Sequence, residues 1–70
     1  MLQEIFFLVH ESPEGGYEAE ALAHSIYTEA DTLEELRRMI QDAVRCHFDP
    51  HDQPGLIRLH FVREEMLALA

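Results

Sequence analysis

The segment from Glu4 to Glu11 holds five consecutive apolar residues, "IFFLV". A run of this length, rich in aromatic and β-branched side chains, is too short for a core helix and predicts a strand covered on both faces. The next segment, Ser12 to Gly16, contains a proline and two adjacent glycines. Since glycine tolerates the positive φ of a tight reversal, we expect Gly15 and Gly16 to turn the chain back.

After this turn the side chains alternate between two sets. One set comprises Tyr17, Ala19 and Ala21, and the other comprises Glu18, Glu20 and Leu22. A period of two predicts a second strand with one solvated face, and the small alanines leave room for an element packed above them. "LAHS" predicts another reversal, and the β-prone residues Ser25 to Thr28 predict a short third strand.

Helical spacing replaces alternation in "ADTLEELRRMIQDAVRCHF". The positions that recur on one side are Leu33, Leu36, Ile40, Ala43, Val44 and His47. This pattern predicts an amphipathic helix. Asp31 or Thr32 is expected to cap its start, with Glu34 or Glu35 completing a capping box. Acidic residues in the first turn and basic residues in the last complement the helix dipole.

The segment "DPHDQPG" ends the helix with two prolines, and "LIRLHFV" then predicts a fourth strand. Its two faces are Ile57, Leu59 and Phe61 against Arg58, His60 and Val62. A helix between two strands usually returns the chain to the sheet in the parallel sense. We therefore expect an α+β fold: two layers in the order β-β-β-α-β, a mostly antiparallel sheet of strand order 3-2-1-4, and one helix on one face.

One helix covers only one face of such a sheet, yet the first strand is apolar on both faces. The opposite face is expected to carry Phe6 and Leu8, flanked by Glu18 and Glu20 on one side and by Arg58 and His60 on the other. An apolar strip with a polar rim is typical of an association surface, so we expect a homo-oligomer, a dimer or higher. The alternative is that "MLALA" folds back over the strip. The tail, residues 63–70, is left open between a frayed end, a short helix and an extra strand.

Length and charge narrow the classes of function. Seventy residues predict one domain, 1–70, whose marginal stability favours self-association. The formal net charge is −9, and protonation of all five histidines would leave it negative, so phosphate backbones should repel the chain and no nucleic-acid partner is expected. An acidic surface favours encounter with a basic partner, or else serves only solubility. One cysteine, no signal-peptide pattern and no membrane-spanning run predict a cytoplasmic protein without a membrane partner.

Candidate catalytic and metal-binding residues are weakly arranged. Cys46, His47 and His51 have ligand types suited to zinc, but adjacent helical residues diverge by about 100°. We instead expect a capping His47, a surface His51 and a partly buried Cys46, with no metal or cofactor. Neighbouring Cys-His and Ser-His pairs face apart, and the exposed pair Glu18 and Glu20 lacks a desolvated pocket.

No Gly-rich phosphate loop is present, because the glycine pair precedes no helix. No enzyme is therefore expected. A catalytic site would have to form between subunits from His10, His24 or His60.

The stretch "EGGYEAEALAHSIYTEADTLEEL" resembles the N-terminal domain of the HicB-type antitoxin family. The matching residues are Gly15, Gly16, Tyr17, Thr28, Asp31, Thr32, Glu34 and Glu35, and the resemblance extends from about Ile5 through Val62. It implies a strand meander, a helix and a fourth strand similar to the opening of the ribonuclease H fold, without the acidic catalytic residues of that fold. The bend "ALAHSI" replaces the Leu-Pro-Gly-Cys favoured in the family, and the DNA-binding segment of full antitoxins is missing.

For function, the resemblance implies an acidic module that binds and masks a small basic RNA-cleaving toxin. Glu18, Glu20 and the charged face of the helix are the expected contacts. The alternative is a stand-alone HicB-like domain that has lost its toxin. Some short relatives are labelled as a 2-oxoisovalerate dehydrogenase β subunit, but 70 residues without a thiamine diphosphate site cannot house that chemistry.

Overall fold

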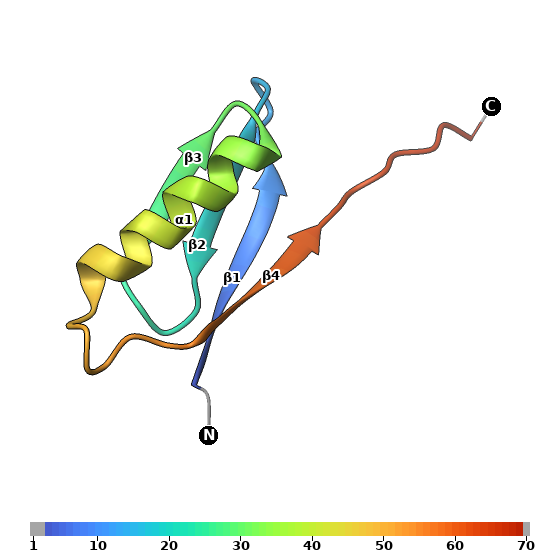
Figure 1. The fold of residues 1–70 in the computed structure, drawn as a ribbon. Coiled ribbons are helices and arrows are strands. Elements are labelled where there is room, and N and C mark those ends of the chain that lie inside the picture. Colours follow the sequence, from blue (N-terminus) through green and yellow to red (C-terminus); the bar gives the residue numbers. More distant parts are fainter. Residues whose placement is uncertain (1–2, 70) are drawn as a thin grey trace.

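The computed structural model of the chain describes residues 3–69. Four strands form one sheet, and a helix lies across one of its faces (Figure 1). The elements are β1 (Glu4–Glu11), β2 (Tyr17–Ala21), β3 (Tyr27–Ala30), α1 (Leu33–His47) and β4 (Leu56–Val62). The strand order is β3-β2-β1-β4, which confirms the predicted α+β topology.

Strand β1 occupies the centre of the sheet and pairs with two neighbours of opposite sense. It is antiparallel to β2, with Val9 opposite Ala19, and parallel to β4, with Val9 opposite Phe61. Strand β2 is in turn antiparallel to β3. The predicted parallel return of the chain after the helix is therefore confirmed.

The hairpin between β1 and β2 turns at the glycine pair. Gly15 has φ +100° and Gly16 has φ +82°, both in the left-handed region. The turn is closed by two backbone hydrogen bonds, from the Ser12 N–H to the Gly16 carbonyl oxygen at 2.9 Å and from the Gly15 N–H to the Ser12 carbonyl oxygen at 3.0 Å. The glycines thus serve the reversal that the sequence predicts.

The third strand is displaced from its predicted position at Ser25 to Thr28, because it runs from Tyr27 to Ala30. The preceding loop is longer than expected. Ala23 takes φ +67°, and the Ala21 N–H donates to the Ile26 carbonyl oxygen at 2.9 Å, so the loop continues through Ile26. Cross-strand pairing then begins one residue later.

Helix α1 begins at the predicted cap. Thr32 has extended backbone angles, and its Oγ1 accepts a hydrogen bond from the Glu35 N–H at 3.1 Å, so Thr32 rather than Asp31 is the N-cap. Apolar positions of the predicted stripe face the sheet: Leu36, Ile40 and Val44 are buried, and Leu33 and Ala43 are half-buried. His47 shares the spacing but is exposed.

The core lies between α1 and the inner face of the sheet. Its largest fully buried side chains are Phe7, Val9, Leu36 and Ile40. Ala19, which is also fully buried, leaves the space above β2 that the helix fills. The helix lies mainly over β3 and β2, whereas β4, which pairs with β1 along its whole length, lies at the edge of the sheet beyond the helix (Figure 1). The inner residues of β4 are consequently only partly covered, and Phe61 is 55% exposed.

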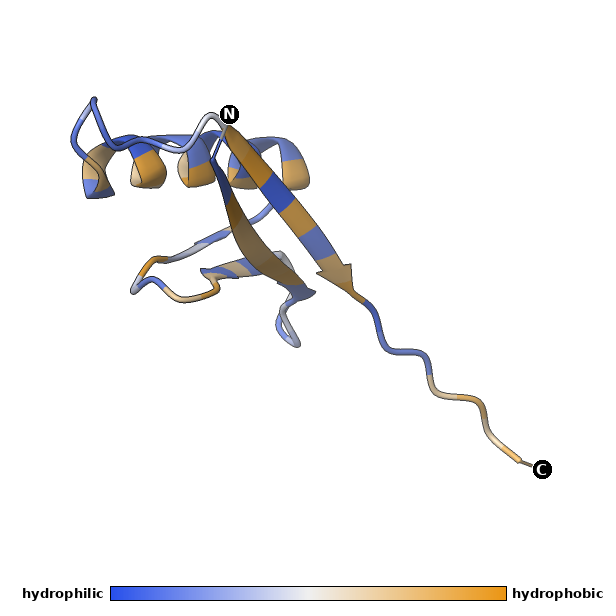
Figure 2. Ribbon diagram, turned by 90° about the horizontal axis from the view of Figure 1, so that it is seen from below, coloured by the Kyte–Doolittle hydropathy of each residue, from blue (hydrophilic) through white to orange (hydrophobic). Residues whose placement is uncertain are grey.

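The tail after β4, residues 63–69, extends away from the body without helix or strand structure (Figures 1 and 2). Every one of these residues is exposed. The alternative in which "MLALA" folds back over Phe6 and Leu8 is therefore wrong for these residues, as are the short helix and the extra strand. Ala70 lies outside the described residues.

Candidate protein-binding surface

The sheet face that α1 leaves uncovered is called the outer face here, and it carries all six residues predicted for it. Strand register places Leu8 between Glu20 of β2 and His60 of β4. Phe6 lies opposite Arg58, and Glu18 lies opposite His10. Since cross-strand partners share a face, the predicted apolar strip and its polar rim are brought together.

The apolar strip is less open than its sequence implies. Phe6 and Leu8 are half-buried within the single chain, and the Phe6 ring packs against the His60 ring at a centroid distance of 5.5 Å. The strongly exposed apolar side chains of the outer face lie instead near its margins, at Tyr27, Leu56 and Val62. Any partner on this face would contact these margins as well as the strip.

Charge divides the outer face into two halves. Glu18, Glu20 and Glu29 lie together on β2 and β3, where Glu18 is opposite Glu29. The β4 half carries Arg58 and His60. The Arg58 Nε donates a hydrogen bond to the Glu4 Oε1 at 2.7 Å, which ties β4 to β1. The unpaired negative charge of the face is therefore concentrated at β2 and β3.

The hydroxyl of Tyr27 lies within this acidic half, and its pKa reflects the negative charge there. Its hydroxyl donates to the Glu29 Oε2 at 3.3 Å. Desolvation by neighbouring side chains and the charges of Glu18 and Glu29 raise the pKa of Tyr27 to about 12. Both carboxylates disfavour a phenolate at this position, which indicates a locally negative potential.

A second acidic feature lies beside the glycine turn and is called the acidic hollow here. It has a volume of about 430 Å³. Its lining residues are Ser12, Glu14, Gly15, Glu29, Ala30, Asp31 and Glu35. No basic side chain is among them, so four carboxylates share one concave surface at the end of the sheet where α1 begins.

Sequence reasoning missed the acidic hollow. The residue pattern does not single out Glu14 or Glu29, and it indicates Asp31 and Glu35 only as cap residues. A signal is nevertheless present, because the chain has no lysine or arginine before Arg37 while acidic residues recur throughout that part. What the sequence does not display is that the hairpin turn folds next to the start of the helix.

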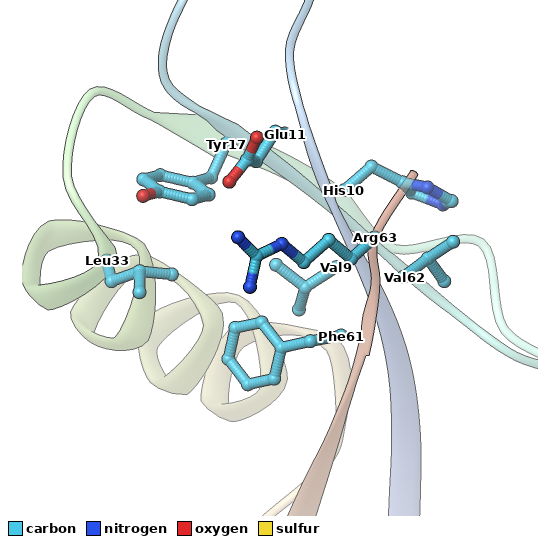
Figure 3. A pocket seen from close by; sticks show the side chains of 8 residues that line it. All are labelled: Val9, His10, Glu11, Tyr17, Leu33, Phe61, Val62 and Arg63. Atoms are coloured by element: carbon cyan, nitrogen blue, oxygen red, sulfur yellow. The ribbon is translucent and has the colours of Figure 1, made fainter. Parts of the chain in front are cut away.

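A third feature, called the edge hollow here, lies between α1 and the end of β4 (Figure 3). It has a volume of about 360 Å³. Its lining residues are Val9, His10, Glu11, Tyr17, Leu33, Phe61, Val62 and Arg63. Arg63 extends into the space bordered by Tyr17, Leu33 and Phe61. The half-buried Tyr17, which follows the glycine turn, thus forms one wall of the hollow.

The histidines and the cysteine do not converge on a metal-binding geometry. The rings of His24, His47 and Phe48 pack edge to face with centroid distances of 4.9 to 5.8 Å. Among residues 3–69 no three His, Cys, Asp or Glu side chains lie close enough to hold a metal ion. Cys46 is exposed, so the expectation of a partly buried thiol is wrong, and His51 lies on the surface as expected.

None of the helices in the described part of the chain is long and apolar enough to cross a membrane.

Two curated proteins are clearly similar to the chain. A UPF0150 protein of Archaeoglobus fulgidus is 52% identical over 52 residues, which cover 74% of this chain and 77% of the relative. A UPF0150 protein of Thermotoga maritima is 43% identical over 67 residues, which cover 96% of this chain and 94% of the relative. No protein-family model matches the chain, and a search of solved structures finds no significant match.

Proposed function

The chain belongs to the UPF0150 family, and within that family we propose that it acts as a non-catalytic, acidic binding module for a small basic protein. The proposal rests on the acidic hollow, where Glu14, Glu29, Asp31 and Glu35 line one concave surface without a basic residue. Carboxylates gathered in this way repel one another, and the approach of a cationic partner reduces this repulsion.

The acidic half of the outer face extends this surface. Glu29 lines the acidic hollow, and its cross-strand partner Glu18 lies on the outer face. A basic partner seated at the β2–β3 edge would therefore meet carboxylates of both regions. The helix contributes less than the sequence suggests, because its exposed side also carries Arg37, Arg38 and Arg45.

The resemblance to HicB-type antitoxins supplies the kind of partner. Under this proposal the partner is a small basic RNA-cleaving toxin, and the chain acts by covering the toxin's cationic RNA-binding surface in the cytoplasm. Masking needs complementary charge and shape but no catalytic group or cofactor on this chain. Direct binding to nucleic acid is not part of the proposal, because a net charge of −9 opposes it.

Self-association through the outer face is the second part of the proposal. Phe6 and Leu8 with the exposed margins at Leu56 and Val62 form an apolar surface framed by Glu20 and His60. Phe6→Lys and Leu8→Lys place a charge in this surface and are expected to lower the mass observed by sizing chromatography. An unchanged mass in both folded variants would contradict this contact.

The partner is tested by affinity capture from an extract of the source cells, followed by an RNA-cleavage assay. The proposal expects a captured protein that is small and basic, that cleaves RNA when isolated, and that stops cleaving RNA when this chain is added back. A captured protein without RNA cleavage, or one that still cleaves RNA when bound, would contradict the masking role.

Matched charge variants locate the contact. Glu14→Gln with Glu29→Gln neutralises two carboxylates of the acidic hollow, whereas Asp49→Asn with Asp52→Asn neutralises two carboxylates of the α1–β4 loop. The first pair is expected to weaken capture by about tenfold or more, since each contact between charged groups contributes on the order of 1 kcal/mol. The second pair should leave capture unchanged. Equal effects of the two pairs would exclude the acidic hollow as the binding surface.

A further inference from the structure

Strand β4 has one paired edge and one open edge. It is the last strand of the order β3-β2-β1-β4, so within residues 3–69 its backbone pairs with β1 on one side only. The chain continues beyond Val62 as an extended tail in which Met66 is 95% and Leu67 is 86% exposed. A long edge strand followed by exposed apolar residues is a ready template for pairing with another chain.

The tail is poorly suited to folding back on its own strand. Residues 63–69 contain no Gly, Pro, Asn or Asp, the residues that favour tight turns. In the structure the tail leaves β4 without reversing (Figure 2). An occupant for the open edge of β4 is therefore better supplied by a second copy, whose own tail is equally uncovered.

We propose that β4 and its tail pair antiparallel with the same segment of a second copy, with Glu64 on the two-fold axis. Each tail then lies along the open edge of the other copy's β4, and the two sheets become continuous. This contact joins the edges of the two sheets and does not stack their outer faces, and it does not depend on the proposed basic partner.

The register follows from matching side chains across the axis. With Glu64 opposite itself, Arg63 of each copy lies opposite Glu65 of the other, which gives two pairs of opposite charge. The apolar pairs are Val62 with Met66, Phe61 with Leu67, and Leu59 with Leu69. Opposed residues share a face, so the partly covered inner side of β4 gains Leu67 and Leu69 of the partner copy.

Neighbouring registers lose these matches. An axis on Arg63 or on Glu65 sets each of those residues against itself, and an axis between Glu64 and Glu65 opposes two carboxylates twice. An axis between Arg63 and Glu64 keeps two opposite-charge pairs, Arg63 with Glu64, but places the apolar Val62 against Glu65 and His60 against Leu67. The favoured register retains one unfavourable pair, Glu64 with itself, on the solvated outer face where salt screens it.

The edge hollow is consistent with this pairing. Arg63 alternates in phase with Phe61, and its side chain extends into the hollow beside that ring (Figure 3). In the paired register Glu65 of the second copy approaches Arg63 on the same side of the sheet. Leu67 of the second copy then lies against Phe61, which the helix leaves 55% exposed.

Cysteine trapping tests the axis directly. In a Cys46→Ser background, Glu64→Cys places the two substituted residues opposite each other. Their Cα atoms would be about 5 Å apart, a separation that a disulfide can bridge. Met66→Cys is the matched control, because two copies of residue 66 are separated by about 13 Å along the strands. Mild oxidation should cross-link Glu64→Cys at least about tenfold faster than Met66→Cys, measured as a species of twice the 8.1 kDa chain mass on a non-reducing gel.

Equal rates at the two positions would indicate random collision of extended tails and would overturn the proposal. So would a faster reaction at residue 66, or no cross-link at residue 64. Because this readout concerns only the tail, it is independent of variants of the outer face and of any basic partner.

Charge exchange supplies a second test. Arg63→Glu and Glu65→Arg each set like charges against one another and should weaken dimerisation by about tenfold, measured by analytical ultracentrifugation. Mixing the two single variants restores both opposite-charge pairs, so a mixed dimer should form more tightly than either variant alone. Glu64→Gln should tighten the wild-type dimer by removing the axial repulsion. Absence of mixed dimers between two folded variants would refute the register.

Discussion

The Cβ of an alanine placed at Gly16 would lie 2.7 Å from the carbonyl oxygen of Ala30, at the end of the neighbouring strand β3. The β1–β2 turn is thus pressed against the end of β3, immediately before the helix begins. This approach also forms the acidic hollow, since it brings Glu14 near Asp31 and Glu35.

Gly16→Ala is expected to destabilise the protein by about 2–3 kcal/mol, because it combines backbone strain at φ +82° with the collision at Ala30. Gly15→Ala is the control. Gly15 has φ +100°, but a Cβ added there would have no atom within 4 Å, so its cost should be only the backbone strain, about 1 kcal/mol. Urea unfolding compares the two variants, and equal losses would exclude the contact with Ala30.

Ala23→Gly should stabilise the β2–β3 loop. Ala23 takes φ +67°, where a Cβ destabilises the folded state by about 1–2 kcal/mol, and glycine would remove this strain. Glycine also makes the unfolded chain more flexible, which lowers the stability of the protein by about 0.4–1 kcal/mol. The difference predicts a net gain of about 0.5 kcal/mol in the free energy of unfolding. Ala21→Gly, within β2, lacks the positive φ and should destabilise; a gain in that variant as well would contradict the explanation.

The helix cap predicts unequal effects at two adjacent positions. Thr32→Ala removes the hydroxyl that accepts from the Glu35 N–H and should cost about 1 kcal/mol. Asp31→Ala removes a side chain that makes no cap hydrogen bond and should cost less. Thermal unfolding followed by circular dichroism measures both. A larger loss for Asp31→Ala would instead identify Asp31 as the helix cap, the other candidate that the sequence permits.

The ion pair between Arg58 and Glu4 should stabilise the β1–β4 contact modestly. The Arg58 side chain is largely exposed, which limits the coupling to about 0.5 kcal/mol. A double-mutant cycle with Arg58→Ala and Glu4→Gln measures this coupling free energy, and added salt should reduce it. A coupling that is zero at low ionic strength would show that the 2.7 Å contact does not persist in solution.

Tyr27 predicts a loss of stability at high pH. Its pKa is about 12 in the folded chain and 10.0 as the ordinary value, so the folded state retains the phenolic proton over a range in which the unfolded state releases it. Stability from this group is fully present below pH 10 and declines as the pH rises toward 12. Ultraviolet absorbance titration should detect the late ionisation, and Glu18→Gln should lower the midpoint. Tyr27→Phe should remove this part of the pH dependence; an unchanged dependence would assign it to another group.

The fold was predictable because each local pattern agrees with the tertiary arrangement. Alternation in β2 and β4 fits strands with one solvated face, the continuous apolar run of β1 fits a central strand, and the stripe of α1 fits a helix on one face. The order β3-β2-β1-β4 satisfies all of these patterns. The predicted bounds of β3 were wrong because "SIYT" has strand propensity throughout, so propensity alone does not indicate where the strand begins. Pairing with Tyr17, set by the glycine turn, extends the strand to Ala30, and the loop takes Ser25 and Ile26.

The candidate surface was only partly predictable. Period-two spacing places Phe6, Leu8, Glu18 and His60 on one face, because strand geometry determines which residues share a face. The spacing does not indicate how deeply a side chain is buried, so the half-burial of Phe6 beneath its neighbours could not be predicted. The acidic hollow joins residues from the hairpin turn, β3 and α1, and its concavity arises only when the glycine turn and the helix cap meet.

The central position of β1 has a consequence for biosynthesis. This strand is translated before the other four elements, and its parallel neighbour β4 follows only after β2, β3 and α1, with Glu4 ultimately opposite Leu56. Until β4 has been made, one edge of the apolar strand β1 has no partner, and such contacts between distant segments form slowly. The nascent polypeptide is therefore exposed to aggregation along this edge until β4 has been translated.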